Sequence, residues 1–196
     1  MSVRSAEGWE RRFSGESRME MSTDRKLRGT AIVFNSLSVN LGGFREIITP
    51  DAVERTLREG LDVRALVDHD TGKVIGRVKA GTLALRKDRH GLRVEIDPPN
   101  TSYARDLMES VERGDISGMS FKFRVPPGGD EWRDEDGGMV RYVRDMTFSE
   151  VSVVSFPAYE QTDVNVALRS MQQFQQAHAG SRLEHLKRWH KTRMAR

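Results

Sequence analysis

The stretch GDISGMSFKFRV, residues 114–125, decides the fold because its side chains alternate with the period of two that is typical of a half-buried β-strand. One face of this strand is apolar and carries Met119, Phe121, Phe123 and Val125. This face predicts the core of the domain. The other face carries Ser120 and Lys122, with Gly118 beside them. Ser120 therefore points away from the main core, and the glycine leaves room above it.

Two serines lie near the start of this strand. A serine hydroxyl becomes a nucleophile only when a base takes its proton. Ser117 shares the parity of the phenylalanines and sits at the frayed start of the strand, directly after a turn. Ser120 is therefore the better candidate for a side chain that faces a cleft. The plain alternative is an exposed strand serine with no chemical role.

The residues on both sides of this strand indicate further short strands and two helices. Apolar and β-branched runs predict strands over residues 28–34, 62–67, 73–79, 82–86, 92–97, 139–148 and 151–156. Capping residues and helical spacing predict helices over residues 49–60 and 100–114. The short loops within 73–97 are typical of an antiparallel meander, and PPGGDEWRDEDGG (126–138) indicates a long acidic loop. These elements predict one α+β domain, mainly β, in which helices pack on a β-barrel or sandwich.

The composition suits one domain of ordinary size with polar ends, in a chain of 196 residues. Residues 1–26 mix both signs of charge without a sustained period, so we expect a mobile arm. From residue 170 onward the chain holds six lysines and arginines against one glutamate, so the net charge of this tail is +5. Because the whole chain has a net charge of +3, the rest of it has a net charge of −2. The tail predicts either a solvated helix or a surface for nucleic acid or an acidic protein.

Several classes of protein are excluded by what the sequence lacks. It has no cysteine, which rules out disulfides, thiolate zinc sites and cysteine nucleophiles. No apolar run approaches the roughly 20 residues of a membrane span, and the N-terminus has no apolar segment of a secretory signal. There is neither an HExxH pattern nor a glycine-rich phosphate loop. We expect no metal, no cofactor and no membrane partner.

Among the five histidines, His69 is the best candidate for a base that activates a serine. It directly follows the predicted strand 62–67, and the end of a strand holds a side chain in a fixed position. His90 lies in a predicted hairpin loop, and the other three histidines lie in the polar tail, where solvation is expected. The alternative for His69 is a polar turn residue.

A third residue would orient the imidazole and stabilise its charged form. Asp68 and Asp70 are adjacent to His69, but neighbours in sequence rarely reach the far ring nitrogen. Glu150 begins a strand that is otherwise apolar or small, and a carboxylate in that position requires a partner. The alternative for Glu150 is a salt bridge to an arginine.

Four motifs together resemble a known family. They are GTAIVFN (29–35), LVDHD (66–70), ISGMSFKF (116–123) and EVSVVSFPAY (150–159). In this order and spacing they resemble the prohead (procapsid) maturation proteases of tailed bacteriophages, over about residues 25–168. That family is similar in fold to the herpesvirus assemblins. The resemblance implies a closed antiparallel β-barrel surrounded by helices.

The resemblance also implies an organisation and a set of roles. The protease domain would span residues 27–168, between the arm at 1–26 and a basic helical tail at 169–196. His69 would be the general base and Ser120 the nucleophile. The assemblin order of histidine, serine and a later residue makes Glu150 the third member. Lys122 departs from the pattern, because many relatives have a glycine or a small residue there; it either lowers the pKa of a neighbour or reaches solvent.

The function implied by the resemblance is that of a serine endopeptidase. Its substrates would be the scaffolding region of the major capsid protein, the scaffold and its own ends, cleaved inside the prohead in the bacterial cytoplasm. The assemblin likeness suggests a homodimer. One rival is a catalytically inactive capsid-assembly or scaffolding protein with the same fold. A second is a nucleic-acid-binding module, which the −2 charge outside the tail and the few aromatic residues within it oppose.

Overall fold

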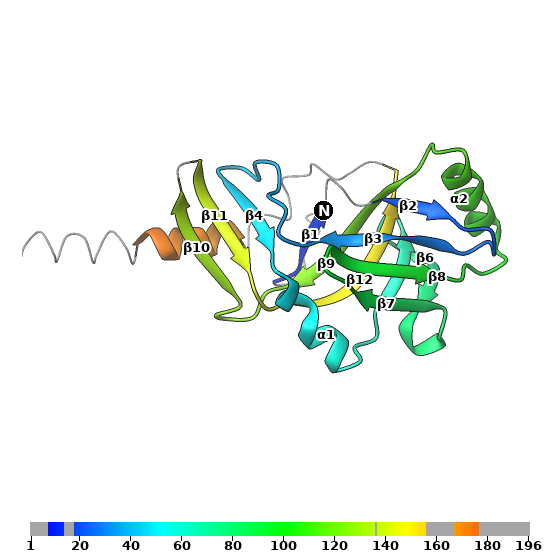
Figure 1. Cartoon of the computed structure of the whole chain (residues 1–196), viewed down its shortest axis with the longest axis horizontal. Coiled ribbons are helices and arrows are strands. Elements are labelled where there is room, and N and C mark those ends of the chain that lie inside the picture. The colour runs from blue at the N-terminus through cyan, green and yellow to red at the C-terminus, as the bar shows by residue number, and fades with distance from the viewer. Residues whose placement is uncertain (1–7, 14–17, 136, 156–166, 177–196) are drawn as a thin grey trace, which may run out of the picture.

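The structure is a computed structural model that describes residues 8–13, 18–135, 137–155 and 167–176. Within these residues the strands form three sheets, of five, four and three strands. Figure 1 shows the three-stranded sheet at one end of the molecule and helix α2 (Ser102–Glu112) at the other. None of the helices in this part of the chain is long and apolar enough to cross a membrane.

The five-stranded sheet has the order β1-β9-β12-β5-β6. Its strands are β1 (Glu10–Phe13), β9 (Gly118–Arg124), β12 (Thr147–Val154), β5 (Arg64–Val67) and β6 (Asp70–Arg77). The strand from which the sequence analysis starts is β9, which pairs antiparallel with β1 on one side and with β12 on the other. In contrast, β12 and β5 run parallel.

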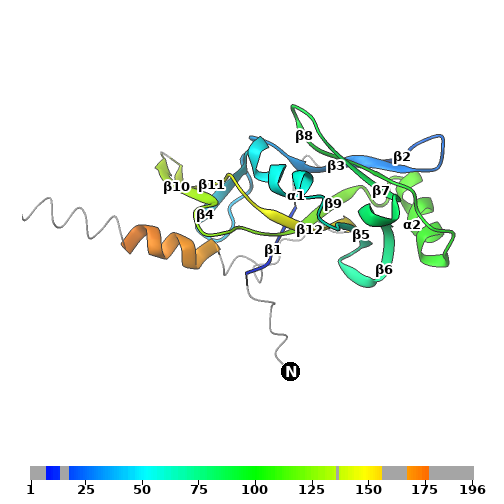
Figure 2. The same cartoon turned by 90° about the horizontal axis from the view of Figure 1, so that it is seen from below.

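The four-stranded sheet lies over the five-stranded one (Figure 2). It has the order β2-β3-β8-β7, and its strands are β2 (Met19–Met21), β3 (Leu27–Val33), β8 (Gly91–Ile96) and β7 (Leu83–Lys87). Apolar side chains of both sheets form the main core, in which Met119, Phe121 and Phe123 are at most 1% exposed. The predicted core face of β9 is therefore confirmed. Each buried phenylalanine contributes roughly 2–3 kcal/mol of hydrophobic free energy.

The three-stranded sheet consists of β10 (Asp130–Glu135), β11 (Gly138–Val143) and β4 (Phe44–Ile48), in that order. A smaller apolar cluster forms here, in which the rings of Phe44 and Trp132 meet edge to face with centroids 5.1 Å apart. Residues 167–176 are helical and pack Ala167 into this cluster. The predicted tail is thus helical over its first part, while 177–196 lie outside the described residues.

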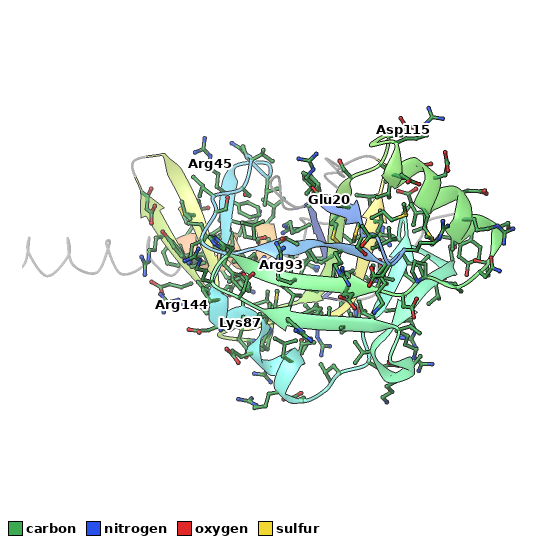
Figure 3. All side chains as sticks on the ribbon, turned by 45° about the vertical axis from the view of Figure 1, so that its right-hand side comes forward. Glu20, Arg45, Lys87, Arg93, Asp115 and Arg144 are labelled. Atoms are coloured by element: carbon green, nitrogen blue, oxygen red, sulfur yellow. The ribbon has the colours of Figure 1, made fainter. Side chains whose placement is uncertain are left out.

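The two predicted helices are confirmed. The first is a 3₁₀ turn, η1 (Pro50–Val53), that continues as α1 (Glu54–Arg58). The second is α2, whose N-cap position is occupied by Thr101 and whose buried face carries Ala104, Leu107, Met108 and Val111. Charged side chains project from the surface around these elements, among them Arg45, Arg93 and Asp115 (Figure 3).

The predicted closed antiparallel barrel is wrong. The described residues form three open sheets, and the pairs β12–β5 and β11–β4 are parallel. The expected meander over 73–97 is divided between two sheets, because the chain leaves β6 through the 3₁₀ turn η2 (Val78–Ala80) and enters the other sheet as β7. The sheets approach closely here, since a Cβ at Gly76 would lie 2.9 Å from Ile96 Cγ2. A bare glycine allows that contact.

Two further segments differ from their sequence-based description. The expected acidic loop contains β10, which pairs with β11 along its whole length while Trp132 is buried on it. The expected arm contributes β1 to the five-stranded sheet and β2 to the four-stranded sheet. Residues 1–7 and 14–17 of that arm lie outside the described residues.

Candidate active site

His69 is presented by a tight turn between β5 and β6. Val67 pairs with Asp70, and the two residues between them, Asp68 and His69, have φ values of +47° and +60°. Two positive φ values in a two-residue hairpin loop are the pattern of a type I′ turn. The turn is tied to β12, because the Asp68 carboxylate accepts hydrogen bonds from the backbone N–H (2.9 Å) and the hydroxyl (3.2 Å) of Ser155. The imidazole is thereby held at one place above the sheet.

Glu150 is placed by a β-bulge in β12. The pairing of β12 with β9 shifts between Phe148 and Glu150, so that Ser149 is the extra residue. Because of this extra residue, Phe148 and Val151 both lie in the core although they are three positions apart. Glu150 and Ser152 then share the opposite face. The bulge therefore turns a carboxylate away from the core toward the polar face of β9.

Ser120 lies on β9 between two neighbouring strands. Ser152 of β12 is its partner on one side, and Phe13 of β1 is its partner on the other. Its side chain has no exposed surface. The sequence-based alternative of an exposed strand serine is therefore wrong.

A chain of hydrogen bonds connects the three side chains. His69 Nε2 lies 2.7 Å from Ser120 Oγ, and His69 Nδ1 contacts Glu150 Oε1. With Nδ1–H donating to the carboxylate, Nε2 carries the lone pair that faces the serine hydroxyl. Ser152 Oγ donates to Glu150 Oε1 over 2.8 Å and lies 3.3 Å from His69 Nδ1. This arrangement is the one required to move a proton from a serine to a histidine.

The electrostatic surroundings keep Glu150 ionised. Burial raises the pKa of its carboxyl, but the hydrogen bond and charge of His69, the hydroxyl of Ser152 and the charge of Lys122 together hold that pKa below its ordinary value. Lys122 pairs with Glu150 across β9 and β12, and its Nζ lies 5.8 Å from the ring centroid of Trp9. Lys122 thus lies on the same face as the site. Of the two alternatives for this residue, the structure favours the one in which its charge lowers the pKa of a neighbour, here Glu150.

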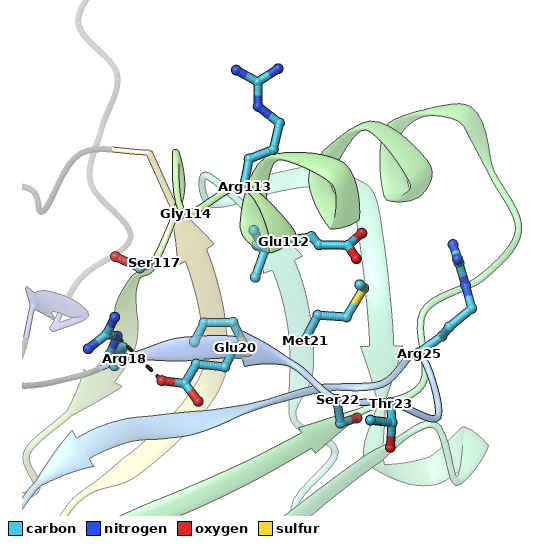
Figure 4. A pocket seen from close by; sticks show the side chains of 12 residues that line it. Arg18, Glu20, Met21, Ser22, Thr23, Arg25, Glu112, Arg113, Gly114 and Ser117 are labelled. Atoms are coloured by element: carbon cyan, nitrogen blue, oxygen red, sulfur yellow. Dashed lines mark ion pairs between the residues drawn. The ribbon is translucent and has the colours of Figure 1, made fainter.

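The other sequence-based candidates lie elsewhere. Ser117 lines a pocket of about 620 Å³ between β2 and the end of α2, together with Arg18 and Glu112 (Figure 4). The carboxylate of Asp68 accepts hydrogen bonds from Ser155, and that of Asp70 accepts one from the backbone N–H of Gly72. The exposed His90 accepts a hydrogen bond from Arg89, its neighbour in the loop. The histidines at positions 178, 185 and 190 lie outside the described residues.

A second buried polar group lies beside this site, and we call it the ionic cluster. It consists of Glu10, Arg12, Glu46, Asp130 and Arg141. The guanidinium of Arg141 donates to Glu10 (2.9 Å), Glu46 (3.0 Å) and Asp130 (2.7 Å), and Arg12 Nε donates to Glu46 over 3.0 Å. Burial raises the pKa of Glu10, against the opposing charges of Arg12 and Arg141. The cluster joins β1 to β4, β10 and β11.

Arg12 connects the two polar groups, because its side chain belongs to the ionic cluster and its backbone reaches the serine. The carbonyl oxygen of Arg12 lies 3.0 Å from Ser120 Oγ. The hydroxyl of Ser120 therefore has two acceptors within reach, the nearer one being His69 Nε2.

Sequence reasoning missed Ser152 and Arg12. For Ser152, the signal is present in the sequence, since a second small polar residue two positions after Glu150 shares its face. Arg12 contacts the serine through a backbone carbonyl, which no side-chain pattern reveals. Among the described residues, no group of three or more His, Asp or Glu side chains is arranged to hold a metal ion.

The comparisons with known proteins identify the family. The model of the caudovirus prohead serine proteases matches residues 14–177, which is most of the chain. The chain therefore belongs to the caudovirus prohead serine protease family, and it is a serine protease of phage capsid maturation. Comparison with curated proteins and with solved structures finds no match.

Proposed function

We propose that the protein is a serine endopeptidase in which Ser120 is the nucleophile, His69 the general base and Glu150 the residue that orients the base. The observation that carries this proposal is the position of His69, whose Nε2 lies 2.7 Å from Ser120 Oγ while its Nδ1 contacts Glu150. Membership of the family supports a protease that acts within the prohead.

In the first half of the proposed reaction, His69 Nε2 takes the proton of Ser120 Oγ as the oxygen attacks the carbonyl carbon of the scissile peptide bond. The tetrahedral intermediate collapses when the imidazolium gives that proton to the departing amine. The C–N bond breaks, and an ester joins Ser120 to the acyl half of the substrate.

In the second half, His69 takes a proton from a water molecule that attacks the ester. The imidazolium then returns the proton to Ser120 Oγ, and the new carboxyl end is released. Glu150 accepts the Nδ1–H bond in every step and stabilises the imidazolium by its charge. Ser152 holds the carboxylate oxygen that receives this bond.

The proposed substrates are the scaffolding region of the major capsid protein, the scaffold and the protease's own ends, cleaved inside the prohead. We further propose a protease domain over 27–168, to whose sheets the N-terminal segment adds β1 and β2, and a homodimer as the assembled form. The rival function is that of a catalytically inactive assembly protein with the same fold.

Co-expression with the capsid protein precursor separates the two functions. We expect the wild-type protein to convert the precursor to a shorter product, and His69→Ala to leave it intact. The matched control is His90→Ala, which removes an exposed loop histidine and should cleave normally. Circular dichroism checks that each variant is folded. An intact precursor with the folded wild-type protein would favour the rival, whereas normal cleavage by His69→Ala would contradict the role of His69 as the general base.

A further inference from the structure

The proposed nucleophile is enclosed, and a substrate needs a path to it. Ser120 has no exposed side-chain surface, although its hydroxyl must reach a carbonyl carbon of another polypeptide segment. On one side, β9 is bordered by β12, which carries Glu150 and Ser152 and is itself paired with β5. A substrate therefore cannot reach β9 from that side, because β12 is an inner strand of the sheet. On the other side, in the part of the chain that the structure describes, lies β1 alone.

The strand β1 is the last strand of the five-stranded sheet. It is four residues long and pairs only with β9 in the described part of the chain. If β1 left, the edge of β9 would present free backbone N–H and C=O groups directly beside Ser120. An exposed strand edge of this kind binds an extended polypeptide by adding it to the sheet, with backbone hydrogen bonds that do not depend on the peptide's sequence.

The contacts of β1 are those of a bound peptide. It runs antiparallel to β9, with Phe13 opposite Ser120 and Arg12 opposite Phe121. It places a backbone carbonyl, that of Arg12, 3.0 Å from the proposed nucleophilic oxygen. Its side chains occupy subsites on both flanks of that carbonyl: the guanidinium of Arg12 reaches Glu46, and the Phe13 ring lies over Gly118, where a Cβ would be 3.5 Å from Phe13 Cε2.

We infer that the edge of β9 beside Ser120 is the binding site for an extended polypeptide substrate, which adds to the sheet as a strand, and that β1 occupies this site in cis. The inference rests on the proposed function and specifies how its substrate binds. In the state that the structure describes, β1 and the substrate compete for the same edge, so the enzyme is latent until β1 departs.

The ionic cluster is the latch that holds β1 in place. Glu10 and Arg12 are the two residues of β1 in the cluster, and both are buried. Removing them together takes away one negative and one positive charge, and it leaves Arg141 paired with Glu46 and Asp130. Glu10→Ala/Arg12→Ala should therefore release β1 without leaving an unpaired charge in the interior.

A matched control exists on another strand. Glu131 and Arg133 of β10 have the same spacing and the same pair of charges, but their side chains are 41% and 45% exposed. Glu131→Ala/Arg133→Ala therefore removes an equivalent pair without touching β1.

The opposite change locks β1. Arg11 and Lys122 are direct partners across β1 and β9, and the Cα separation of such antiparallel partners lies within the range that a disulfide spans. Because the chain has no cysteine, Arg11→Cys/Lys122→Cys can form one disulfide only. The reduced form of this variant is the control for the oxidised form, since both carry the same substitutions.

The experiment measures binding of a fluorescein-labelled peptide with the sequence of residues 8–13, GWERRF, by fluorescence anisotropy. All proteins carry Ser120→Ala so that no peptide is cleaved. We expect Glu10→Ala/Arg12→Ala to bind the peptide with a Kd at least about tenfold lower than that of the protein with native β1, which corresponds to about 1.4 kcal/mol of binding free energy. Glu131→Ala/Arg133→Ala should bind like the protein with native β1. The oxidised lock should not bind, and its reduction should restore binding.

Equal binding by the oxidised and reduced lock would overturn the inference. Cleavage of an unlabelled capsid-precursor peptide, measured with Ser120 restored, reports on the proposed function separately. If binding follows the expected order but no variant cleaves, the proposed function fails and the binding site stands. If the oxidised lock cleaves as fast as the reduced form, the binding site fails and the protease function stands.

Discussion

The molecule contains two neighbouring buried polar groups that differ in chemistry. The proposed catalytic group, made of His69, Ser120, Glu150 and Ser152, has a histidine at its centre and hydroxyls at both ends. The ionic cluster has an arginine at its centre and carboxylates around it. An imidazole gains and loses a proton near neutral pH, whereas a guanidinium keeps its charge. The first group is therefore suited to proton transfer and the second to holding strands together.

The largest difference between the two groups is expected at Ser120, whose removal should affect activity and leave stability nearly unchanged. We expect Ser120→Ala to lower kcat by about 10⁶-fold, as removal of the nucleophile does in other serine proteases, while the free energy of unfolding changes little. Ser117→Ala should keep normal activity, because Ser117 lines the separate pocket in Figure 4. Cleavage of a capsid-precursor peptide measures both variants. Loss of activity in Ser117→Ala with activity kept in Ser120→Ala would reverse the assignment.

The next largest effect is expected at Glu150. We expect Glu150→Gln to lower kcat by about 10³–10⁴-fold, because the amide no longer stabilises the imidazolium and favours the wrong tautomer. Asp68→Ala and Asp70→Ala are the controls, since their carboxylates hold a turn and a loop amide instead of the imidazole. If either aspartate variant loses more activity than Glu150→Gln, Glu150 is not the third member.

The ionic cluster should respond in stability. We expect Arg141→Met to lower the free energy of unfolding by about 3–5 kcal/mol, because it leaves the buried carboxylates of Glu10 and Glu46 with Arg12 as their cation and removes the ion pair of Asp130. Arg144→Met, which breaks an exposed pair with Glu131, should cost at most about 1 kcal/mol. Urea denaturation measures both variants. Equal losses of unfolding free energy in the two variants would mean that the ionic cluster stabilises the fold no more than an exposed ion pair does.

The smallest effect is expected at Ser152, which is a positioning residue. We expect Ser152→Ala to lower kcat about tenfold, through the loss of one hydrogen bond worth about 1 kcal/mol. The pH dependence separates this role from simple packing. The folded-state pKa of Glu150 is lowered, so its ionisation stabilises the fold above its ordinary value of 4.5, and this contribution is lost as the pH falls through the lowered value.

Ser152 is one of the groups that lower this pKa, so Ser152→Ala should lose part of that stabilisation at pH 7. The difference in free energy of unfolding between the wild type and Ser152→Ala should shrink when urea denaturation is repeated well below pH 4.5. A difference that is the same at both pH values would indicate packing alone.

The sequence draws attention to His69, Ser120 and Glu150 of the proposed catalytic group but not to the ionic cluster, for a physical reason. His69 and Ser120 stand at a strand end and on a strand face, and local periodicity reveals both positions. Glu150 stands out as a charge in an apolar strand. Glu10 and Arg12 look like ordinary surface charges, because the carboxylates and guanidiniums that justify their burial come from β4, β10 and β11, far away in the sequence.

The fold shows the same division between local and distant information. The period of β9 and the positions of the two helices are set locally, and these predictions are confirmed, although neither Thr49 nor Thr101 caps its helix with a side-chain hydrogen bond. The closed barrel is wrong because strand partners are set by contacts between distant segments, such as the parallel pairing of β12 with β5. The acidic loop prediction failed because β10 carries one aromatic residue, Trp132, among charged ones, and the ring of Phe44 that Trp132 packs against is far away in the sequence.

The central claim is that His69 activates Ser120, and covalent labelling tests it most directly. The wild-type protein and Glu10→Ala/Arg12→Ala are incubated with an aryl fluorophosphonate, and the modified residue is located by mass spectrometry. The account predicts a single adduct on Ser120, formed faster in the variant and lost when His69→Ala is added. An adduct on Ser117, or undiminished labelling of Ser120 without His69, would contradict it.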